Sequence, residues 1–183
     1  MDFSIAPFTL RDDPAPIIAA WRDAFADPPS GPRAAHELGN QLARHGLMQG
    51  FAGCLARDAT TERILGVGYG FSNLPGQWWR DRVAQALGPS RTRELLDNSF
   101  CLMELGIVRS ARRHGIAEAL VKGLLTQQGH PQALLSTQSD NSGALAFYLA
   151  TGWHIVAPKM SFGFGFAPYD ILWCPRPHTK KVK

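Results

Sequence analysis

The hydrophobic and polar positions of the chain follow two spacings, one typical of strands and one typical of helices. Residues 4–10 alternate loosely between apolar and polar and predict a first strand. After Pro14, which suits a first helical turn, apolar residues recur at helical spacing, at Ile17, Ile18, Trp21 and Phe25. The segment 27–32 is rich in Pro and Gly, so it ends this helix, and 34–45 predicts a second helix.

Two strand-like segments follow, at 49–57 and 63–72. Residues 58–62 between them are few and polar, which favours a hairpin. Glycines alternate with other residues across 66–70, but no helix follows them directly, as a nucleotide-binding loop would require. We therefore expect these glycines to allow another part of the chain to approach closely.

The segment 77–98 is predicted to be a variable helical insertion. Apolar residues keep helical spacing through its first half, at Trp79, Val83, Ala86 and Leu87, and 93–96 can add a short second turn. Since aromatic residues at helical spacing usually pack on a core, Trp79 is expected to be buried. Trp78 lies one position off this stripe and is a better candidate for lining a substrate pocket.

A strand, a basic turn and a helix follow one another across residues 100–117. The apolar run suits a buried strand, and after Gly115 the apolar residues fall on one helical face, at Ile116, Ala117, Leu120, Val121 and Leu124. The turn contributes Arg112, Arg113 and His114 immediately before this helix. Backbone N–H groups and the positive end of a helix dipole would meet there, so the segment predicts a phosphate site.

The remaining pattern predicts a strand at 133–137, a helix at 141–153 and a closing hairpin from 153–156 and 169–174. The fourth and fifth strands each lead into a helix, which indicates a parallel pair. Between the arms of the hairpin, Phe162, Phe164 and Phe166 alternate with glycines on one face. These aromatic residues suit a substrate wall, a dimer contact or a half-buried hairpin.

Composition narrows the class of protein. With 183 residues, of which 45% are hydrophobic, the chain is expected to form a single domain over 1–183, with a basic tail at 179–183. No run reaches the length of about 18 apolar residues that a membrane span needs, and no export signal is seen at the start, so a cytoplasmic protein without a membrane partner is expected.

Charge and cysteine content exclude further classes. The three cysteines are widely spaced without a C-x-x-C pair, so neither a disulfide framework nor a metal site is predicted. The net charge of +4 suits a polyanionic ligand. Because the basic residues are dispersed along the chain, no nucleic-acid partner is expected.

Neither a P-loop nor a dinucleotide-binding glycine pattern occurs around the basic turn. The pattern that does occur, Arg112-x-x-Gly115-x-Ala117 behind Leu105-x-Ile107, resembles the acetyl-CoA-binding motif Q/R-x-x-G-x-G/A of the GNAT N-acetyltransferase superfamily. Arg109 stands where that family usually has a proline. A second segment, Asn141 to Trp153, resembles the family's N-x-x-A-x-x-F/Y-Y-x-x-x-G-F/W, and the two motifs together cover about the C-terminal half.

The resemblance implies a fold and a cosubstrate. The expected fold is α/β (α+β), the GNAT fold: a central mixed, mostly antiparallel sheet of about six to seven strands, flanked by helices. Its parallel fourth and fifth strands splay apart, and the pantetheine arm of acetyl-CoA lies between them as a pseudo-strand. The two N-terminal helices are expected beside the acceptor substrate.

The resemblance also assigns residues to the cosubstrate. The backbone N–H of Val108 would polarise the thioester carbonyl, while backbone groups near Ile107 and Arg109 would pair with the pantetheine amides. Asn141 would contact the cofactor and cap its own helix. The full predicted cofactor-binding set is Ile107, Val108, Arg109, Arg112, Arg113, His114, Gly115, Ile116, Ala117 and Asn141.

Two catalytic residues are predicted. Tyr148 matches the family's tyrosine acid, which protonates the departing thiolate; the alternative is a core tyrosine with a satisfied hydroxyl. Glu104 is the only carboxylate within the apolar run of the fourth strand, so partial desolvation would raise its pKa towards use as a general base at neutral pH. The alternative to Glu104 is deprotonation by water, and no metal is expected to take part.

The predicted function is transfer of an acetyl group from acetyl-CoA to a primary amine of a small molecule, by direct attack through a tetrahedral intermediate. Trp78 and Phe164 are the candidates for the acceptor pocket. A protein N-terminus or lysine is the alternative acceptor, and a non-catalytic acyl-CoA-binding regulatory domain is the alternative class. A monomer or a homodimer would suit any of these.

Overall fold

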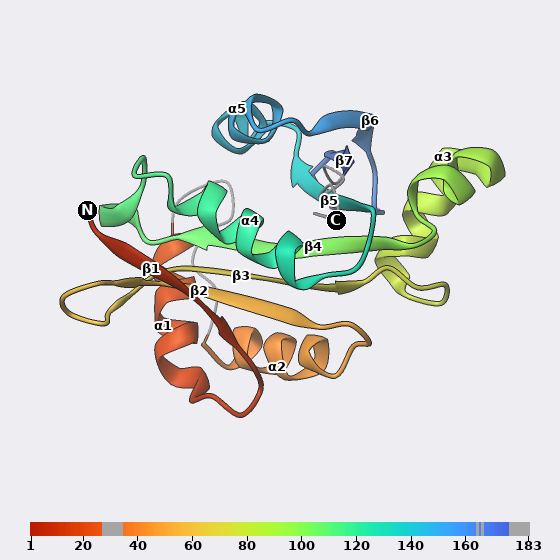
Figure 1. The fold of residues 1–183 in the computed structure, drawn as a ribbon. Coiled ribbons are helices and arrows are strands. Elements are labelled where there is room, and N and C mark those ends of the chain that lie inside the picture. The colour runs from red at the N-terminus through yellow and green to blue at the C-terminus, as the bar shows by residue number, and fades with distance from the viewer. Residues whose placement is uncertain (27–34, 164, 166, 176–183) are drawn as a thin grey trace, which may run out of the picture. The chain divides into compact units, whose positions relative to one another are not determined.

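The computed structural model describes residues 1–26, 35–163, 165 and 167–175 (Figure 1). The strands form a seven-stranded sheet in the order β1-β2-β3-β4-β5-β7-β6. The chain divides into two compact units, one made of Met1–Phe71 and Leu102–Gln128, the other of Ser72–Cys101 and the chain from Gly129 onward. Strand β4 (Ser99–Ile107) begins in the second unit and ends in the first.

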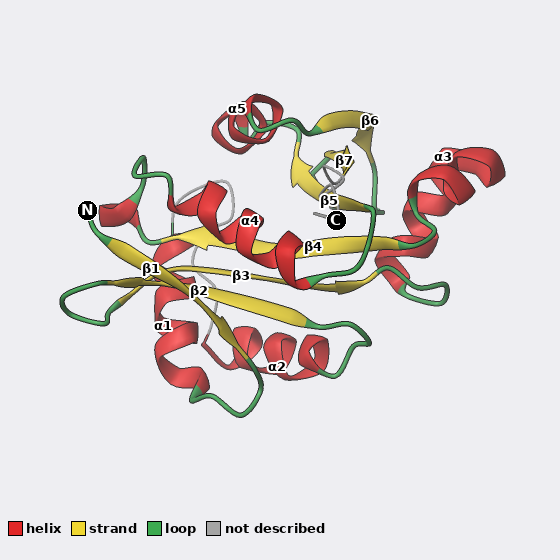
Figure 2. Ribbon diagram, in the orientation of Figure 1, coloured by secondary structure: helices red, strands yellow, loops and turns green. Residues whose placement is uncertain are grey.

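The first unit holds three antiparallel strands and the helices around them. Its elements are β1 (Phe3–Phe8), α1 (Pro14–Ala24), α2 (Ala35–Gly46), β2 (Ala52–Asp58), β3 (Ile64–Ser72), the end of β4, a 3-10 turn (Arg109–Ala111) and α4 (Ile116–Gln127). Strand β2 pairs antiparallel with both β1 and β3. Helices α1 and α2 lie on one face of these strands and α4 on the opposite face (Figure 2).

Helix α1 begins where the local sequence predicts. The Asp13 carboxylate accepts a hydrogen bond from the Ala15 N–H at 3.0 Å, and Pro14 occupies the first turn. Ile17 and Trp21 are buried on the face that the helical spacing predicted.

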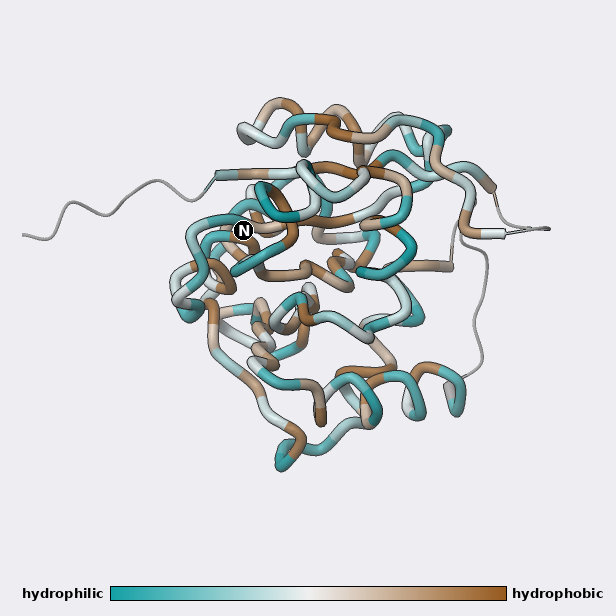
Figure 3. The backbone as a smooth tube through the Cα atoms, turned by 90° about the vertical axis from the view of Figure 1, so that its right-hand side faces the viewer, coloured by the Kyte–Doolittle hydropathy of each residue, from teal (hydrophilic) through white to brown (hydrophobic). Residues whose placement is uncertain are grey.

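Helix α2 is more polar than α1, and the tube of Figure 3 alternates between hydrophilic and hydrophobic positions along it. Leu38 and Leu42, one turn apart, are its buried residues among those described. The opposite positions of the helix are exposed, so α2 presents one narrow apolar stripe to the strands.

Strand β3 is buried along its whole length, and its glycines make room for α4. A Cβ atom at Gly66 would lie 2.8 Å from Ile107 Cδ1 and 3.0 Å from Leu120 Cδ1. At Gly68 it would lie 3.1 Å from Leu124 Cδ1. Side chains of β4 and α4 fill this space, and the Gly106 carbonyl of β4 lies 3.2 Å from the Gly66 Cβ position, so backbone also approaches closely there, as predicted.

The second unit holds the other strands of the sheet. Its elements are α3 (Trp78–Leu95), the start of β4, β5 (Gln132–Gln138), α5 (Ser142–Ala150), β6 (His154–Met160) and β7 (Tyr169–Pro175). Residues 99–101 of β4 pair in parallel with residues 132–134 of β5. Strand β7 pairs antiparallel with both β5 and β6.

The insertion predicted at 77–98 is helical, with a break. Gly88 has φ 76° and ψ 169°, outside helical geometry, and Pro89 follows it, so α3 consists of two helical pieces. Trp79 is 9% exposed, and its indole N–H donates to the Ser136 hydroxyl at 3.0 Å. The prediction that Trp79 packs on the core is confirmed.

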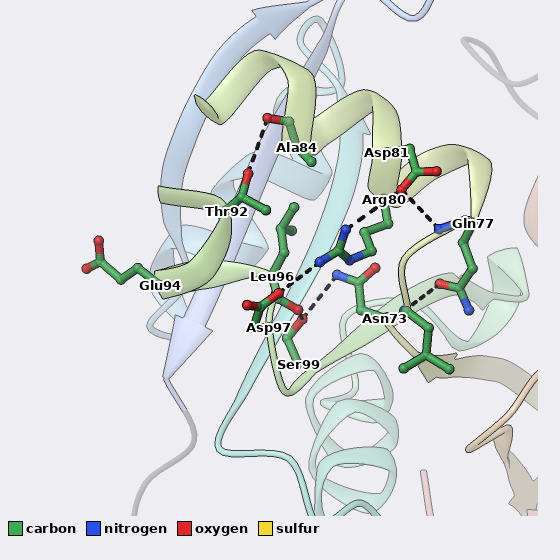
Figure 4. Close-up of polar contacts among 12 residues, drawn as sticks. Asn73, Gln77, Arg80, Asp81, Ala84, Thr92, Glu94, Leu96, Asp97 and Ser99 are labelled. Atoms are coloured by element: carbon green, nitrogen blue, oxygen red, sulfur yellow. Dashed lines mark hydrogen bonds and ion pairs between the residues drawn. The ribbon is translucent and has the colours of Figure 1, made fainter. Parts of the chain in front are cut away.

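Polar contacts fix the base of α3 (Figure 4). The buried Arg80 guanidinium pairs with Asp97 at 2.8 Å and with Asp81 at 3.7 Å. Nearby, the buried Asn73 amide donates to the Ser99 hydroxyl at 3.0 Å. The Arg80 pair joins the first turn of α3 to Asp97 in the turn before β4, and the Asn73 bond joins the residue after β3 to Ser99, the first residue of β4.

The predicted fold class is confirmed: the sheet is mixed, mostly antiparallel, and has a parallel β4/β5 pair. In the part of the chain described, no helix is long and apolar enough to cross a membrane. Phe164, Phe166 and the basic tail at 179–183 lie outside the described residues.

Candidate functional site

The turn before α4 has the backbone geometry of an anion cradle. Arg113 has φ 66°, an uncommon left-handed conformation for a residue with a side chain, and Gly115 has φ 79°. Gly115 is the N-cap of α4 and receives no side-chain cap. The first N–H groups of α4 have no partners inside the helix, and left-handed residues in the turn gather such groups into one concavity.

Space and charge at this turn both suit a phosphate. A Cβ atom at Gly115 would meet nothing within 4 Å. Arg112, Arg113 and His114 are exposed around it. The His114 Nδ1 atom lies 2.8 Å from the Arg112 carbonyl, and since a carbonyl only accepts, Nδ1 carries the hydrogen.

Arg112 has a structural contact that the sequence did not reveal. Its Nη2 donates to the carbonyl of Ala24, at the end of α1, at 2.9 Å, and its Nε lies 3.4 Å from the Ile107 carbonyl. The guanidinium therefore ties the turn to α1. Phosphate binding by Arg112 stays a prediction.

The role predicted for the Val108 N–H needs correction. This N–H donates to the Leu65 carbonyl of β3 at 2.9 Å, so it pairs within the sheet and is not directed at a thioester. Because the N–H groups of successive strand residues point to opposite sides, the Ile107 N–H points to the edge of β4 away from β3. The local register of β3 and β4 decides this, and sequence alone does not give it.

Glu104 lies on the face of the sheet that carries α1 and α2. Its neighbour Leu105 lies on the α4 face, because Leu105 Cδ1 is 3.2 Å from where a Cβ of Gly68 would be. Glu104 is half-buried, and its Oε1 accepts a hydrogen bond from the Gln41 side-chain amide of α2 at 2.7 Å. The structure thus places this carboxylate against α2.

Three residues for which the sequence predicted no role form a chain of polar contacts that begins at Glu104. The Gln41 amide nitrogen also lies 3.4 Å from the Tyr69 hydroxyl, and that hydroxyl lies 3.1 Å from His45 Nδ1. Tyr69 is fully buried, with its ring edge-on to Trp21 at 5.5 Å. We call Gln41, His45, Tyr69 and Glu104 the α2 polar cluster. Gln41 and His45 are four residues apart and so lie on one helix face, and this spacing is the sequence pattern that could have pointed to the cluster.

The cysteines do not supply a nucleophile. Complete burial raises the pKa of the Cys101 thiol to about 12. Burial also raises the pKa of Cys54, against the opposing effect of a hydrogen bond from Gln127. Since the thiolate is the reactive form, burial makes both thiols poorer nucleophiles near neutral pH. Among the described residues, no group of His, Cys, Asp and Glu side chains has the arrangement of a metal site.

In the second unit, Asn141 and Tyr148 both belong to the α5 region. The Asn141 carboxamide oxygen accepts from the Ala144 N–H at 3.2 Å, so the capping role predicted for Asn141 is confirmed. Tyr148 is 8% exposed, and its ring contacts those of Phe147 and Trp153, at 5.0 and 5.5 Å between centroids. The ring is thus packed among aromatic side chains, and the acid role of Tyr148 stays a prediction.

Trp78 is the exposed member of an aromatic row in the second unit. Its side chain is 57% exposed, and its ring lies 5.5 Å from that of the buried Phe162. Phe162 in turn meets Tyr169 edge-on at 5.4 Å. An exposed indole backed by a packed ring suits contact with a ligand, whereas Phe164, its predicted companion, lies outside the described residues.

Comparison with known proteins agrees with this geometry. No protein-family model matches the sequence. The chain is 35% identical over 91 residues to a GCN5-like protein acetyltransferase of Mycobacterium tuberculosis. The aligned part covers 47% of this chain and 44% of that protein. The chain therefore spans less than half the length of this relative.

Solved structures match along almost the whole chain. An acetyltransferase from Thermus thermophilus has a TM-score of 0.69 at 13% identity, covering 96% of this chain and 98% of that one. A GNAT superfamily phosphinothricin acetyltransferase from Sinorhizobium meliloti, in complex with acetyl-CoA, has 0.66 at 15% identity, covering 100% and 93%. The ribosomal-protein-S18-alanine N-acetyltransferase from Escherichia coli has 0.61 at 10% identity, covering 100% and 99%.

Proposed function

We propose that this chain, which has the GNAT fold and whose resemblance to the GNAT N-acetyltransferases is confirmed, transfers an acetyl group from acetyl-CoA to a primary amine of a small molecule. The observation that carries the proposal is the turn at the start of α4. Two left-handed residues, Arg113 and Gly115, shape that turn, and basic side chains surround it. A helix N-terminus of this kind is suited to the phosphates of coenzyme A.

The cosubstrate would be held by the predicted residues that the structure leaves available. The N–H groups of Gly115, Ile116 and Ala117 would bind phosphate oxygens, and Arg113 and His114 would add charge. The Ile107 N–H, which points away from β3, would donate to a carbonyl of the bound cosubstrate. This assignment replaces the Val108 N–H, which is paired with Leu65.

In the proposed reaction Glu104 accepts a proton from the ammonium form of the acceptor, and the neutral amine then attacks the thioester carbonyl to form the tetrahedral intermediate. As the C–S bond breaks, Tyr148 gives its proton to the departing thiolate, and the tyrosinate takes the second proton that the nitrogen loses. The products are the acetamide and free coenzyme A. Direct transfer is favoured because the described thiols with raised pKa values are poor nucleophiles.

A protein amine is the second candidate acceptor. The relative from M. tuberculosis is named as a protein acetyltransferase, and it is 35% identical over the aligned part. An acceptor screen should therefore contain N-terminal and lysine peptides beside small amines.

The test follows free thiol release from acetyl-CoA over such a panel, with calorimetry of acetyl-CoA binding alongside. Turnover with a small amine supports the leading proposal, and turnover with peptides alone supports the second candidate. Absence of binding heat at millimolar acetyl-CoA would reject both.

Tyr148→Phe separates an enzyme from a non-catalytic acyl-CoA-binding domain. In an enzyme this variant should bind acetyl-CoA normally and lose turnover, because it removes the phenolic hydroxyl, the proposed proton donor, and keeps the ring. If the wild type binds acetyl-CoA and releases no thiol with any amine, the non-catalytic class is favoured.

A further inference from the structure

The α2 polar cluster joins the proposed catalytic carboxylate to a helix that lies far earlier in the chain. Glu104 stands on β4, whereas its hydrogen-bond donor Gln41 lies 63 positions earlier, on α2. We propose that Gln41 is a positioning residue for Glu104, and that Tyr69 and His45 hold Gln41 in the orientation that donates to the carboxylate. This inference rests on the proposed function, in which Glu104 is the base.

The chemistry of the groups fixes the direction of each bond. An ionised carboxylate only accepts, so the Gln41 side chain must present its NH2 group to Glu104 Oε1, at 2.7 Å. That short distance is typical of a hydrogen bond strengthened by charge. The second hydrogen of the same nitrogen is available to the Tyr69 oxygen, at 3.4 Å.

The Tyr69 hydroxyl then orients its own hydrogen. Its oxygen accepts from Gln41, and we assign its hydrogen to His45 Nδ1, at 3.1 Å, because this direction leaves the oxygen to Gln41. With this assignment a neutral His45 accepts at Nδ1 and carries its hydrogen on Nε2. Tyr69 itself is immobilised, since it is fully buried and its ring contacts Trp21 and Phe51 at 5.5 and 5.8 Å.

The consequence is a half-buried carboxylate with one oxygen held in place. A carboxylate on a strand can rotate about its side-chain torsions, and each unproductive orientation lowers the fraction of molecules ready to accept a proton. Gln41 restricts that rotation and stabilises the charged form. Its removal should therefore change kcat and the pH dependence more than the binding of acetyl-CoA.

The first test compares Gln41→Met with Asn40→Ala. Met keeps the length of the side chain and its helix propensity but has no N–H, while Asn40 is the exposed neighbour on the same helix. Gln41→Met should lower kcat about tenfold and move the rising limb of kcat/KM to higher pH. Asn40→Ala should match the wild type in both.

A second measurement is independent of turnover. The 15N spectrum of the imidazole groups should show neutral His45 as the Nε2–H tautomer in the wild type, and in Gln41→Met a shift towards Nδ1–H, because the Tyr69 oxygen has lost its donor. His45→Gln identifies the signals. Thermal unfolding of all variants checks that they are folded.

The outcomes distinguish a failure of the positioning role of Gln41 from a failure of the proposed function. An unchanged kcat and pH profile in Gln41→Met, with an unchanged His45 tautomer, would overturn the positioning role. A wild type without binding heat or thiol release would reject the proposed function instead. In that case the imidazole spectra alone decide whether Gln41 organises the cluster.

Discussion

Arg112 and Ala24 are linked by a hydrogen bond in which the guanidinium Nη2 donates to the Ala24 backbone carbonyl at 2.9 Å. Ala24 is the last residue of α1, where the helix leaves carbonyls without internal partners and where its dipole attracts a cation. The basic turn before α4 is thus held by the end of a helix 88 positions earlier in the chain.

Arg112 and Arg113 should therefore respond differently to removal. Arg112→Ala should lower the free energy of unfolding by about 1 kcal/mol, because the Ala24 carbonyl loses a charged donor. Arg113→Ala should leave the unfolding free energy near wild type and weaken acetyl-CoA binding, more so at low salt. Urea unfolding and calorimetry on both variants measure this, and equal effects of the two on stability would contradict it.

Substitutions at Gly115 test the phosphate turn. Gly115→Asp should abolish binding of acetyl-CoA, because it places a negative charge at the N-terminus of α4 where phosphates are expected. Gly115→Ala is the control for backbone strain: its Cβ meets no atom within 4 Å, but φ 79° costs about 1 kcal/mol of stability. Calorimetry that finds wild-type affinity in the Asp variant would remove this turn from the site.

Replacement of the proposed base is the third prediction. Glu104→Gln should lower kcat/KM by a factor of about 10² to 10⁴, the usual contribution of a positioned base. Acetyl-CoA affinity should stay near wild type, since the side chain faces α2. If steady-state rates across pH are the same in both proteins, water rather than Glu104 accepts the proton.

The adjacent tryptophans offer a matched pair. Trp79→Ala should cost about 3–5 kcal/mol of stability, because the buried ring and its bond to Ser136 are lost. Trp78→Ala should change stability little, as the side chain is 57% exposed. If Trp78 lines the acceptor pocket, its loss should lower kcat/KM for the acceptor by about 1–3 kcal/mol without affecting acetyl-CoA.

Trp78→Phe provides the comparison, since it keeps an aromatic ring against Phe162. Melting curves and acceptor kinetics should both be measured for Trp78→Ala, Trp78→Phe and Trp79→Ala. A large drop in melting temperature for Trp78→Ala with unchanged kinetics would show that this ring only packs.

Alkaline pH should destabilise the fold through Cys101. Its thiol has a pKa of about 12 in the folded chain because of burial, and 9.0 without that burial. Between these values the unfolded chain has lost the proton while the folded chain keeps it, so stability falls as pH rises, by up to about 1.4 kcal/mol per unit. Below pH 9.0 this contribution disappears.

The measurement is urea unfolding at pH 8 and pH 10 for wild type and Cys101→Ala. The variant should lose less stability between the two conditions, even if it is less stable at both. Equal losses would mean that other groups cause the alkaline effect.

The predicted segments match the structure because burial periodicity is a local property of sequence. The strand at 100–107 and the helix after Gly115 carry their own pattern of apolar residues, and both form as predicted. The cap at Asn141 is equally local.

What the sequence did not reveal depends on contacts between distant segments. The bond from Val108 to Leu65 follows from the register of β3 and β4, and that from Gln41 to Glu104 from the packing of α2 on the sheet. Neither contact can be predicted from the residues next to it in the sequence. Tyr69 was hidden for a different reason, since a tyrosine within a glycine-rich buried strand is indistinguishable by pattern from a packing residue.

The two glycines of β3 under α4 have a consequence for how the chain can diverge. A larger residue at Gly66 would collide first with Ile107 and then with Leu120, unless both side chains moved or shortened at the same time. Such paired changes would keep α4, and the turn at its start, in place. A selection for acetyl-CoA binding that starts from Gly66→Ala should therefore recover smaller residues at positions 107 and 120, that is, compensating mutations away from the proposed phosphate turn.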